Sequence, residues 1–324
     1  MNLHENEELF QDAVVATAQM LDIPEIFVEK DYWVTLVLHK IFHSSMAEAA
    51  VFKGGTALSK CHGLIERFSE DIDMVVLKNP GDSHSQLDRK VRKIGKVVES
   101  ILPEIHIEGV TNKMGKIRKT AHQFEKVFSG DYGQVRPDII VETTWFGNSE
   151  PNTEEDVSSY IAEMMHRQNQ HDLIEEYGLQ PFKVRVVSKE ISLCEKIMSL
   201  VRFSRRENAY EDLANKIRHI YDIHMMLLDS EIEQFFKSQL FDKMLITVGK
   251  EDVESFNNNN EWLVEHPGKA VIFNQVQDTW NNIRSTYRGV FSELVIGKLP
   301  DDNEIISTLK RVSNRLNKVD WKLG

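Results

Sequence analysis

Two short stretches decide the fold of this 324-residue chain, FKGGTALSK at residues 52–60 and FSEDIDMVV at residues 68–76. The two glycines of the first stretch permit a tight turn in which the backbone approaches a phosphate closely. The aspartates of the second, Asp71 and Asp73, are two residues apart, so in a strand both carboxylates lie on one face. Carboxylates and substrate phosphates are the ligands that Mg²⁺ prefers. Together the stretches predict a site for a metal and a nucleoside triphosphate.

The composition narrows the class of protein. A chain of 324 residues can bury a large core, and its length favours two packed domains. The two cysteines, Cys61 and Cys194, suit a reducing compartment. The N-terminal residues do not form a basic region followed by an apolar run, and no apolar stretch approaches the roughly 18 residues that a membrane span requires. We therefore expect a soluble, cytoplasmic protein without a membrane partner.

The charge is distributed unevenly. The formal net charge of −12 argues against indiscriminate binding of nucleic acid. Residues 89–119, however, contain nine basic and three acidic side chains. At helical spacing, Arg89, Arg92, Lys93 and Lys96 share one face, opposite an apolar stripe. This basic face is either an ordinary solvated helix surface or a surface that follows the phosphates of RNA.

Helices are expected before the glycine turn and throughout the C-terminal part. Residues 9–20 and 26–42 carry apolar side chains at helical spacing, with a break at residues 22–24. From residue 190 onward the pattern is almost wholly helical. Residues 182–187 could form a last strand before that region.

Strands are expected between these helical regions. Residues 105–127 alternate in a way that predicts a hairpin turning near residues 112–115. Residues 137–145 also read as a strand. We therefore predict an α+β domain at residues 1–188, followed by a helical domain at residues 189–324.

A third carboxylate is expected beside the two aspartates if the site holds a pair of metal ions on the triphosphate, because two ions need several acidic ligands. Asp138 and Glu142 share a face of the strand expected at residues 137–145. Glu142 ends an apolar run and is favoured. Asp138 follows a proline, as a residue that begins a strand would, and stays an alternative.

Five motifs extend in order over about two-thirds of the chain: EKDYW at residues 29–33, GGTALSK at 54–60, FSEDID at 68–73, EKI at 195–197 and RHIYDI at 218–223. Together they resemble the nucleotidyltransferase superfold and, within it, the AbiEii/AbiGii toxin family. The resemblance implies a mixed sheet with flanking helices, followed by a C-terminal helical domain. It also implies a cognate antitoxin as partner.

The same resemblance implies an activity. The expected enzyme is a Mg²⁺-dependent nucleotidyltransferase with two metal ions, which transfers a nucleoside monophosphate from an NTP to an RNA acceptor, tRNA. Two alternatives stay open: the same transfer to a protein hydroxyl, and an NTP-binding interaction module without turnover. The destination of a labelled nucleotide and the release of pyrophosphate would distinguish the three.

The resemblance further assigns the site residues. It supports Glu142 as the third acid, so that the catalytic and metal-binding residues would be Asp71, Asp73 and Glu142. The nucleotide contacts would be Gly54, Gly55, Thr56, Lys60, Ser69, Lys196, Arg218 and Asp222. His219 stands where an acidic residue is expected, so no carboxylate role is expected there. From the sequence alone, Lys196 would be a lysine at a helix margin, and Arg218 and Asp222 a surface ion pair.

Overall fold

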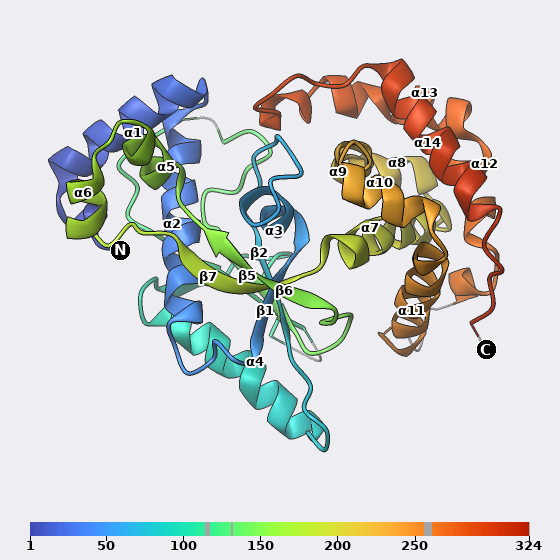
Figure 1. Ribbon diagram of the computed structural model, residues 1–324, viewed down its shortest axis with the longest axis horizontal. Helices are drawn as coiled ribbons and strands as arrows, with labels where there is room; N and C mark the ends of the chain where they lie inside the picture. The colour runs from blue at the N-terminus through green and yellow to red at the C-terminus, as the bar shows by residue number, and fades with distance from the viewer. Residues whose placement is uncertain (114–116, 131, 256–260, 324) are drawn as a thin grey trace. The chain divides into compact units, whose positions relative to one another are not determined.

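The fold is described from a computed structural model of the chain (Figure 1). The residues that the structure describes are 1–113, 117–130, 132–255 and 261–323. The chain divides into two compact units, which are described separately. The first unit comprises Met1–Gly63 and Phe68–Val187, and the second comprises Leu64–Arg67 and Ser188–Gly324.

A mixed β-sheet forms the centre of the first unit. The seven strands found in the described residues run in the order β3-β4-β5-β2-β1-β7-β6. Their bounds are β1 Ala50–Lys53, β2 Ile72–Val76, β3 Glu104–Ile105, β4 Ile117–His122, β5 Ile139–Thr144, β6 Asn152–Val157 and β7 Phe182–Val187. Strand β2 is parallel to β5 and β1 is parallel to β7, whereas the other neighbours are antiparallel. The sheet confirms the predicted α+β class.

Helices cover this sheet and close its core. Their bounds are α1 Glu7–Leu21, α2 Glu25–Phe42, α3 Gly54–Lys60, α4 His84–Glu99, α5 Tyr160–Arg167 and α6 His171–Glu176, after a short 3₁₀ turn, η1, at Leu3–Glu5. Helices α2 and α4 pack against each other and against the strands. The two helices expected near the N-terminus are therefore present as α1 and α2. Asp22, in the left-handed conformation, ends the first of them.

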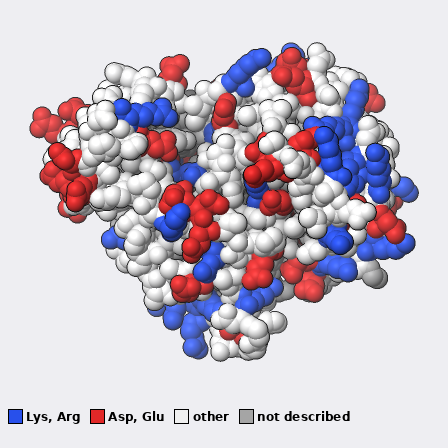
Figure 2. All heavy atoms as spheres, viewed as in Figure 1, with Lys and Arg blue, Asp and Glu red and all other residues white. Residues whose placement is uncertain are grey.

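Helix α4 has the two faces that its sequence predicts. Ser83 caps its first turn through a capping box with Gln86. Its buried residues are Leu87, Val91, Ile94, Gly95 and Val98, whereas Arg89, Arg92, Lys93 and Lys96 are exposed. In Figure 2, Lys and Arg side chains gather where Figure 1 places α4.

The strands agree in part with the sequence pattern. The predicted hairpin corresponds to β3 and β4, which pair antiparallel, although residues 114–116 at its expected turn lie outside the described residues. The expected strands at residues 137–145 and 182–187 are present as β5 and β7. Strand β6 was not expected, because its sequence NTEEDV is polar. It lies at the edge of the sheet, where charged side chains are tolerated and discourage further pairing.

The second unit is helical. Its α-helices are α7 Lys189–Ser204, α8 Ala209–Ala214, α9 Ile217–Met226, α10 Ser230–Lys237, α11 Gln239–Ser255, α12 Val271–Asn274, α13 Val276–Arg288 and α14 Asp302–Leu316. Short 3₁₀ turns are η2 Glu261–Leu263, η3 Pro267–Lys269 and η4 Ser292–Leu294. None of the helices in the described ranges combines the length and apolar character that a membrane crossing needs.

Candidate active site

Four charged residues occupy one level of the sheet across neighbouring strands. The register pairs Lys53 of β1 with Asp73 of β2, Asp73 with Glu142 of β5, and Glu142 with Lys119 of β4. Residues paired in this way point to the same face of a sheet. The two carboxylates therefore lie side by side between two lysines, and Lys119 Nζ is 3.1 Å from Glu142 Oε2. We call Lys53, Asp73, Glu142 and Lys119 the charged row.

The glycine turn lies directly against this row. Gly54 begins α3 immediately after β1 and has φ of 83°, a conformation that disfavours residues with a Cβ. A Cβ on Gly54 would stand 2.2 Å from Asp73 Oδ2, inside the carboxylate. The backbone of the turn and the Asp73 carboxylate can therefore be neighbours only because residue 54 is glycine.

Burial and like charge together perturb Asp73. The pKa of its carboxyl group is raised from 3.8 to about 7, first by burial, then by the negative charges of Glu142 and Asp71, with Lys53 and Lys119 opposing the shift. Carboxylates that repel one another in this way favour a proton or a cation between them. The site therefore has the electrostatic character of a cation site.

The loop before β2 is bound to helix α3. Thr56 is buried, and its hydroxyl donates to the backbone oxygen of Asp71 at 2.6 Å and lies 3.1 Å from Ser69 Oγ. The Asp71 carboxylate is about one-third exposed, and Arg136 Nη1 lies 3.5 Å from its Oδ1. Thr56 and Ser69, both predicted to contact nucleotide, thus hold Asp71 beside the glycine turn.

The acids of this site fit a divalent metal by their chemistry. Within the described ranges, no three His, Cys, Asp or Glu side chains lie close enough to be grouped as a metal site. The adjacent pair Asp73 and Glu142, with Asp71 as a further negative neighbour, nevertheless supplies hard oxygen atoms directly beside the glycine turn. The donors suit Mg²⁺, and burial together with the charges of Glu142 and Asp71 outweighs the two lysines in raising the pKa of Asp73.

Asp138, the alternative third acid, lies elsewhere. It immediately precedes β5 and is buried, with Oδ1 3.6 Å from Lys126 Nζ. Its backbone oxygen accepts a hydrogen bond from Lys30 at 3.0 Å. Glu142, by contrast, is the direct strand partner of Asp73. The geometry thus favours Glu142 over Asp138.

Helix α2 carries three consecutive charged residues that are all buried, Glu29, Lys30 and Asp31. The Glu29 carboxylate accepts hydrogen bonds from the backbone nitrogens of Val127 and Phe128 at 2.7 and 3.1 Å. Burial raises the pKa of Glu29, against the effect of these bonds. One end of α2 is thus bound to the segment that follows β4.

Lys30 binds the loops that lead into the two acidic strands. Its ammonium lies 2.6 Å from Glu70 Oε2, and both side chains are nearly inaccessible. It also donates to the backbone oxygens of Arg136 and Asp138. Glu70 in turn accepts from the backbone nitrogen of Arg136 at 3.0 Å. This cluster links the residues just before β2 to those just before β5.

Asp31 binds the end of helix α3. Its carboxylate pairs with Lys60 and accepts from the backbone nitrogen of Tyr160 at 2.8 Å. The Lys60 ammonium is buried and lies 5.0 Å from the centre of the Tyr160 ring. The structure therefore directs Lys60 toward α2, and its contact with nucleotide stays a prediction.

The remaining predicted residues belong to the second unit. Asp222 is fully buried and binds Arg67 through both carboxylate oxygens, at 2.7 and 2.8 Å, and Lys196 at 2.7 Å. Burial alone would raise the pKa of Asp222, but the two cations lower it below its ordinary value. Lys196 and Asp222 thus form a buried ion cluster. Their contact with nucleotide, like that of Arg218, stays a prediction.

The sequence patterns do not single out Lys53 or Lys119. Lys53 directly precedes the glycine turn, and Lys119 is one of the nine basic residues between positions 89 and 119. Proximity to a motif is the only signal that could have found Lys53. For Lys119 the signal would have been the two-residue spacing from Ile117, which places both side chains on one face of β4. The pairing of β4 with β5 then shows that Lys119 lies beside Glu142.

Comparisons with known proteins found matches to this chain. A family model described as the nucleotidyl transferase AbiEii toxin of type IV toxin–antitoxin systems matches residues 36–305. The chain belongs to this AbiEii family. It is therefore a nucleotidyltransferase toxin, and membership implies an NTP substrate and an antitoxin partner.

Several solved chains are similar to this AbiEii toxin. Among them is MenT4, a nucleotidyltransferase toxin from Mycobacterium tuberculosis, with 16% sequence identity and a TM-score of 0.47. The match covers 94% of this chain and 98% of that one. No curated protein matches the chain.

Proposed function

We propose that the toxin uses Mg²⁺ to transfer a nucleoside monophosphate from an NTP to the terminal hydroxyl of an RNA, with tRNA as the acceptor. The charged row beside the Gly54 turn carries this proposal. It places two adjacent carboxylates, which are hard oxygen ligands for a cation, directly against a glycine turn. The choice of RNA over protein as acceptor rests on the family resemblance and on the exposed basic face of α4.

In this reaction a bond forms between the acceptor oxygen and the α-phosphorus of the NTP, and the bond from that phosphorus to pyrophosphate breaks. The proton of the acceptor hydroxyl passes to solvent water. Bound Mg²⁺ would supply charge neutralisation for the attacking and leaving oxygens. Asp71, Asp73 and Glu142 would hold it. Their arrangement is favourable because the electrostatic cost of placing these acids together is relieved when a cation binds.

The other residues of the site would orient the substrate. The Gly54–Gly55 turn, which has no side chains of its own, would bring its backbone N–H groups close to a phosphate. Lys53, whose positive charge opposes the raised pKa of Asp73, would neutralise phosphate charge at the edge of the row. Thr56 and Ser69 would keep the Asp71 loop in place through the hydrogen bonds described above.

The test uses NTPs labelled at the α-phosphate, incubated with the toxin, Mg²⁺, total cellular RNA and total cellular protein. We expect the label in the RNA fraction, with release of pyrophosphate. Label in protein would overturn the choice of acceptor. Nucleotide binding without pyrophosphate release would overturn the enzymatic proposal.

The matched control is the double variant Asp71→Asn with Asp73→Asn. These amides retain the size of the carboxylates but remove the negative charge that holds the cation. We expect the variant to be folded and to transfer no label. Transfer at the wild-type rate by this variant would show that the acids are not the metal ligands.

A further inference from the structure

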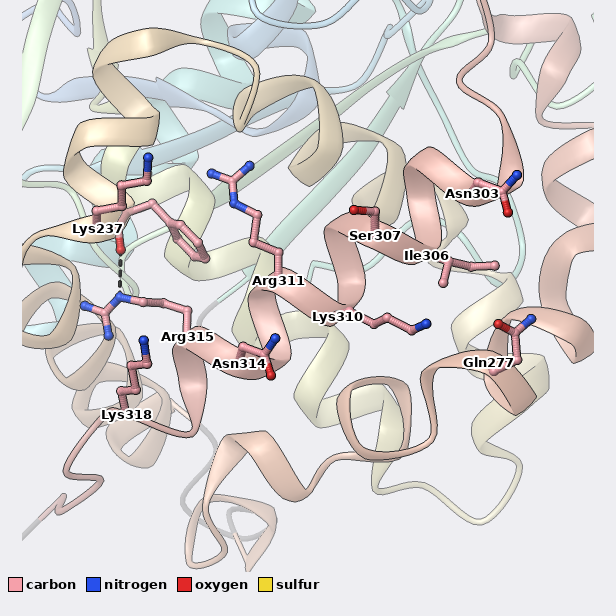
Figure 3. A pocket seen from close by; sticks show the side chains of 11 residues that line it. Lys237, Gln277, Asn303, Ile306, Ser307, Lys310, Arg311, Asn314, Arg315 and Lys318 are labelled. Carbon is pink, nitrogen blue, oxygen red and sulfur yellow. Dashed lines mark hydrogen bonds between the residues drawn. The ribbon is translucent and has the colours of Figure 1, made fainter.

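The second unit contains a cavity of about 680 Å³ that the proposed active site does not use. Three helices line it, α10, α13 and α14 (Figure 3). The lining residues are Phe236, Lys237, Gln277, Asn303, Ile306, Ser307, Lys310, Arg311, Asn314, Arg315 and Lys318. In Figure 2, Lys and Arg side chains gather over the region that Figure 1 labels α13 and α14.

Helix α14 forms one wall of this cavity with its polar face. Its buried stripe consists of Ile305, Thr308, Leu309, Val312 and Leu316. Lys310, Asn314 and the following Lys318 repeat every four residues and line the cavity. At about 1.5 Å per helical residue, such a step is about 6 Å. Because an amphipathic packing stripe already holds the helix, the exposed side chains of this wall need not serve the fold.

The lining is strongly basic. Five of the eleven lining residues are lysine or arginine and none is acidic. Acids from outside the lining pair with some of these cations: Glu233 with Lys237 and Arg311, and Asp242 with Arg315. Lys310 and Lys318 have no ion-pair partner among the residues that the structure describes. The cavity therefore retains a net positive charge.

We propose that this cavity binds the phosphate backbone of an RNA strand. Successive phosphates of such a strand are separated by a distance similar to the step between Lys310 and Asn314. Asn303, Asn314, Gln277 and Ser307 supply neutral donors and acceptors, which suit the sugar hydroxyls between phosphates. The inference rests on the proposed function in one respect, that the substrate of the toxin is RNA.

The lining favours this ligand over the alternatives. Only Phe236 and Ile306 are large apolar residues, so the cavity does not suit an apolar ligand. Arg311 is held by the Glu233 carboxylate. Arg315 is held by Asp242 and by backbone oxygens, including that of Phe236 at 2.8 Å from its Nε; Figure 3 marks this bond with a dashed line. The positions of both arginines are thereby fixed before a ligand arrives. The two unpaired lysines, which are exposed, can follow a flexible strand.

The test compares two double variants of the full chain. Lys310→Gln with Lys318→Gln removes the two unpaired charges of the cavity. Lys269→Gln with Lys298→Gln removes two exposed lysines of the same unit that do not line the cavity. The probe is fluorescently labelled total tRNA, and binding is measured by anisotropy between 0.05 and 0.2 M salt, with EDTA and without NTP.

We expect the cavity variant to bind the tRNA about 25-fold more weakly at about 0.1 M salt, and its salt dependence to decrease by about 1.4 in log–log slope, because two phosphate contacts of roughly 0.7 each are lost. The control variant should change less than half as much on the same logarithmic scale. Equal effects of the two variants, or no effect of the cavity variant, would overturn the proposal.

A parallel measurement with labelled oligoglutamate distinguishes an acidic protein partner. If the cavity variant loses the peptide but retains tRNA, the cavity binds acidic protein and the RNA proposal is wrong. The proposed function is judged separately, by label transfer with the wild-type toxin. Transfer to RNA without an effect of the cavity lysines on binding would refute this inference alone, whereas tRNA binding without transfer would refute the proposed function alone.

Discussion

Replacement of Gly54 by alanine tests whether the glycine turn positions the Asp73 carboxylate. The added Cβ would lie 2.2 Å from Asp73 Oδ2, whereas ordinary contacts begin at 3.4 Å, so the carboxylate must retreat by about 1.2 Å. A displacement of about 1 Å at a reacting centre can cost about 100-fold in rate. We therefore expect Gly54→Ala to reduce label transfer by at least about 100-fold.

The left-handed backbone at residue 54 contributes a second, separable effect. Its φ of 83° costs a residue with a Cβ roughly 1–2 kcal/mol of stability. Gly81 provides the matched control, because it has φ of 90° and an added Cβ there would meet nothing within 4 Å. Gly81→Ala should lose a similar free energy of unfolding in urea and retain its transfer rate.

The comparison of the two variants isolates the carboxylate. Both are measured for stability by urea denaturation and for activity by transfer of label from NTP, at a temperature where both are folded. If Gly54→Ala transfers as fast as Gly81→Ala, the turn does not position Asp73 for the reaction, and the argument from the 2.2 Å approach is wrong.

Three further predictions follow from the same geometry. Glu142→Gln should reduce transfer by at least about 100-fold and Asp138→Asn by less than about tenfold, and the reverse order would make Asp138 the third ligand. In EDTA, the free energy of unfolding of the wild type should fall as pH rises from about 4 to 7, because native Asp73, with its pKa near 7, binds a proton that the unfolded chain has released. Asp73→Asn should lose less stability between pH 5 and pH 8, as measured by urea denaturation. An identical loss in the two proteins would contradict the raised pKa. Lys30→Met should cost about 3–5 kcal/mol by leaving Glu70 buried and unpaired, whereas Lys183→Met, at an exposed pair, should have little effect; equal stability of the two variants would refute the structural role of the α2 lysine.

The parts of the site that depend on local sequence could be predicted. The glycine turn, the strand that follows Asp71 and the helical spacing of α2 each reflect neighbouring residues, and the structure contains all three. Local sequence could not predict that Asp73 and Glu142 are neighbours, because this depends on the register in which two strands about 70 residues apart pair. The end of an apolar run and the family resemblance both favour Glu142, but only the pairing of β2 with β5 places it beside Asp73.

Partners from distant segments explain what the sequence could not predict. Lys60 follows the glycine motif, as a phosphate ligand would, yet its ammonium pairs with Asp31 of a helix that precedes the motif. Asp222 looks like half of a surface pair with Arg218, but it is buried against Arg67 and Lys196. Strand β6 lacks alternating apolar residues, so only its backbone pairing with β7 in the structure identifies it as a strand. In each case the deciding contact joins residues that no local pattern connects.

The buried charges of helix α2 also constrain the order in which the first unit folds. Glu29, Lys30 and Asp31 each bind a backbone group of a distant segment, 98, 106 and 129 residues further along the chain. Before those segments are in place, burial of α2 would leave Glu29 without a partner, and Lys30 and Asp31 with only Glu70 and Lys60, which is costly in an apolar interior. The helix itself can form early from local contacts, but its charged residues can be buried only after these distant segments have packed against it. We therefore expect substitutions at these residues to accelerate unfolding while leaving the rate of folding nearly unchanged.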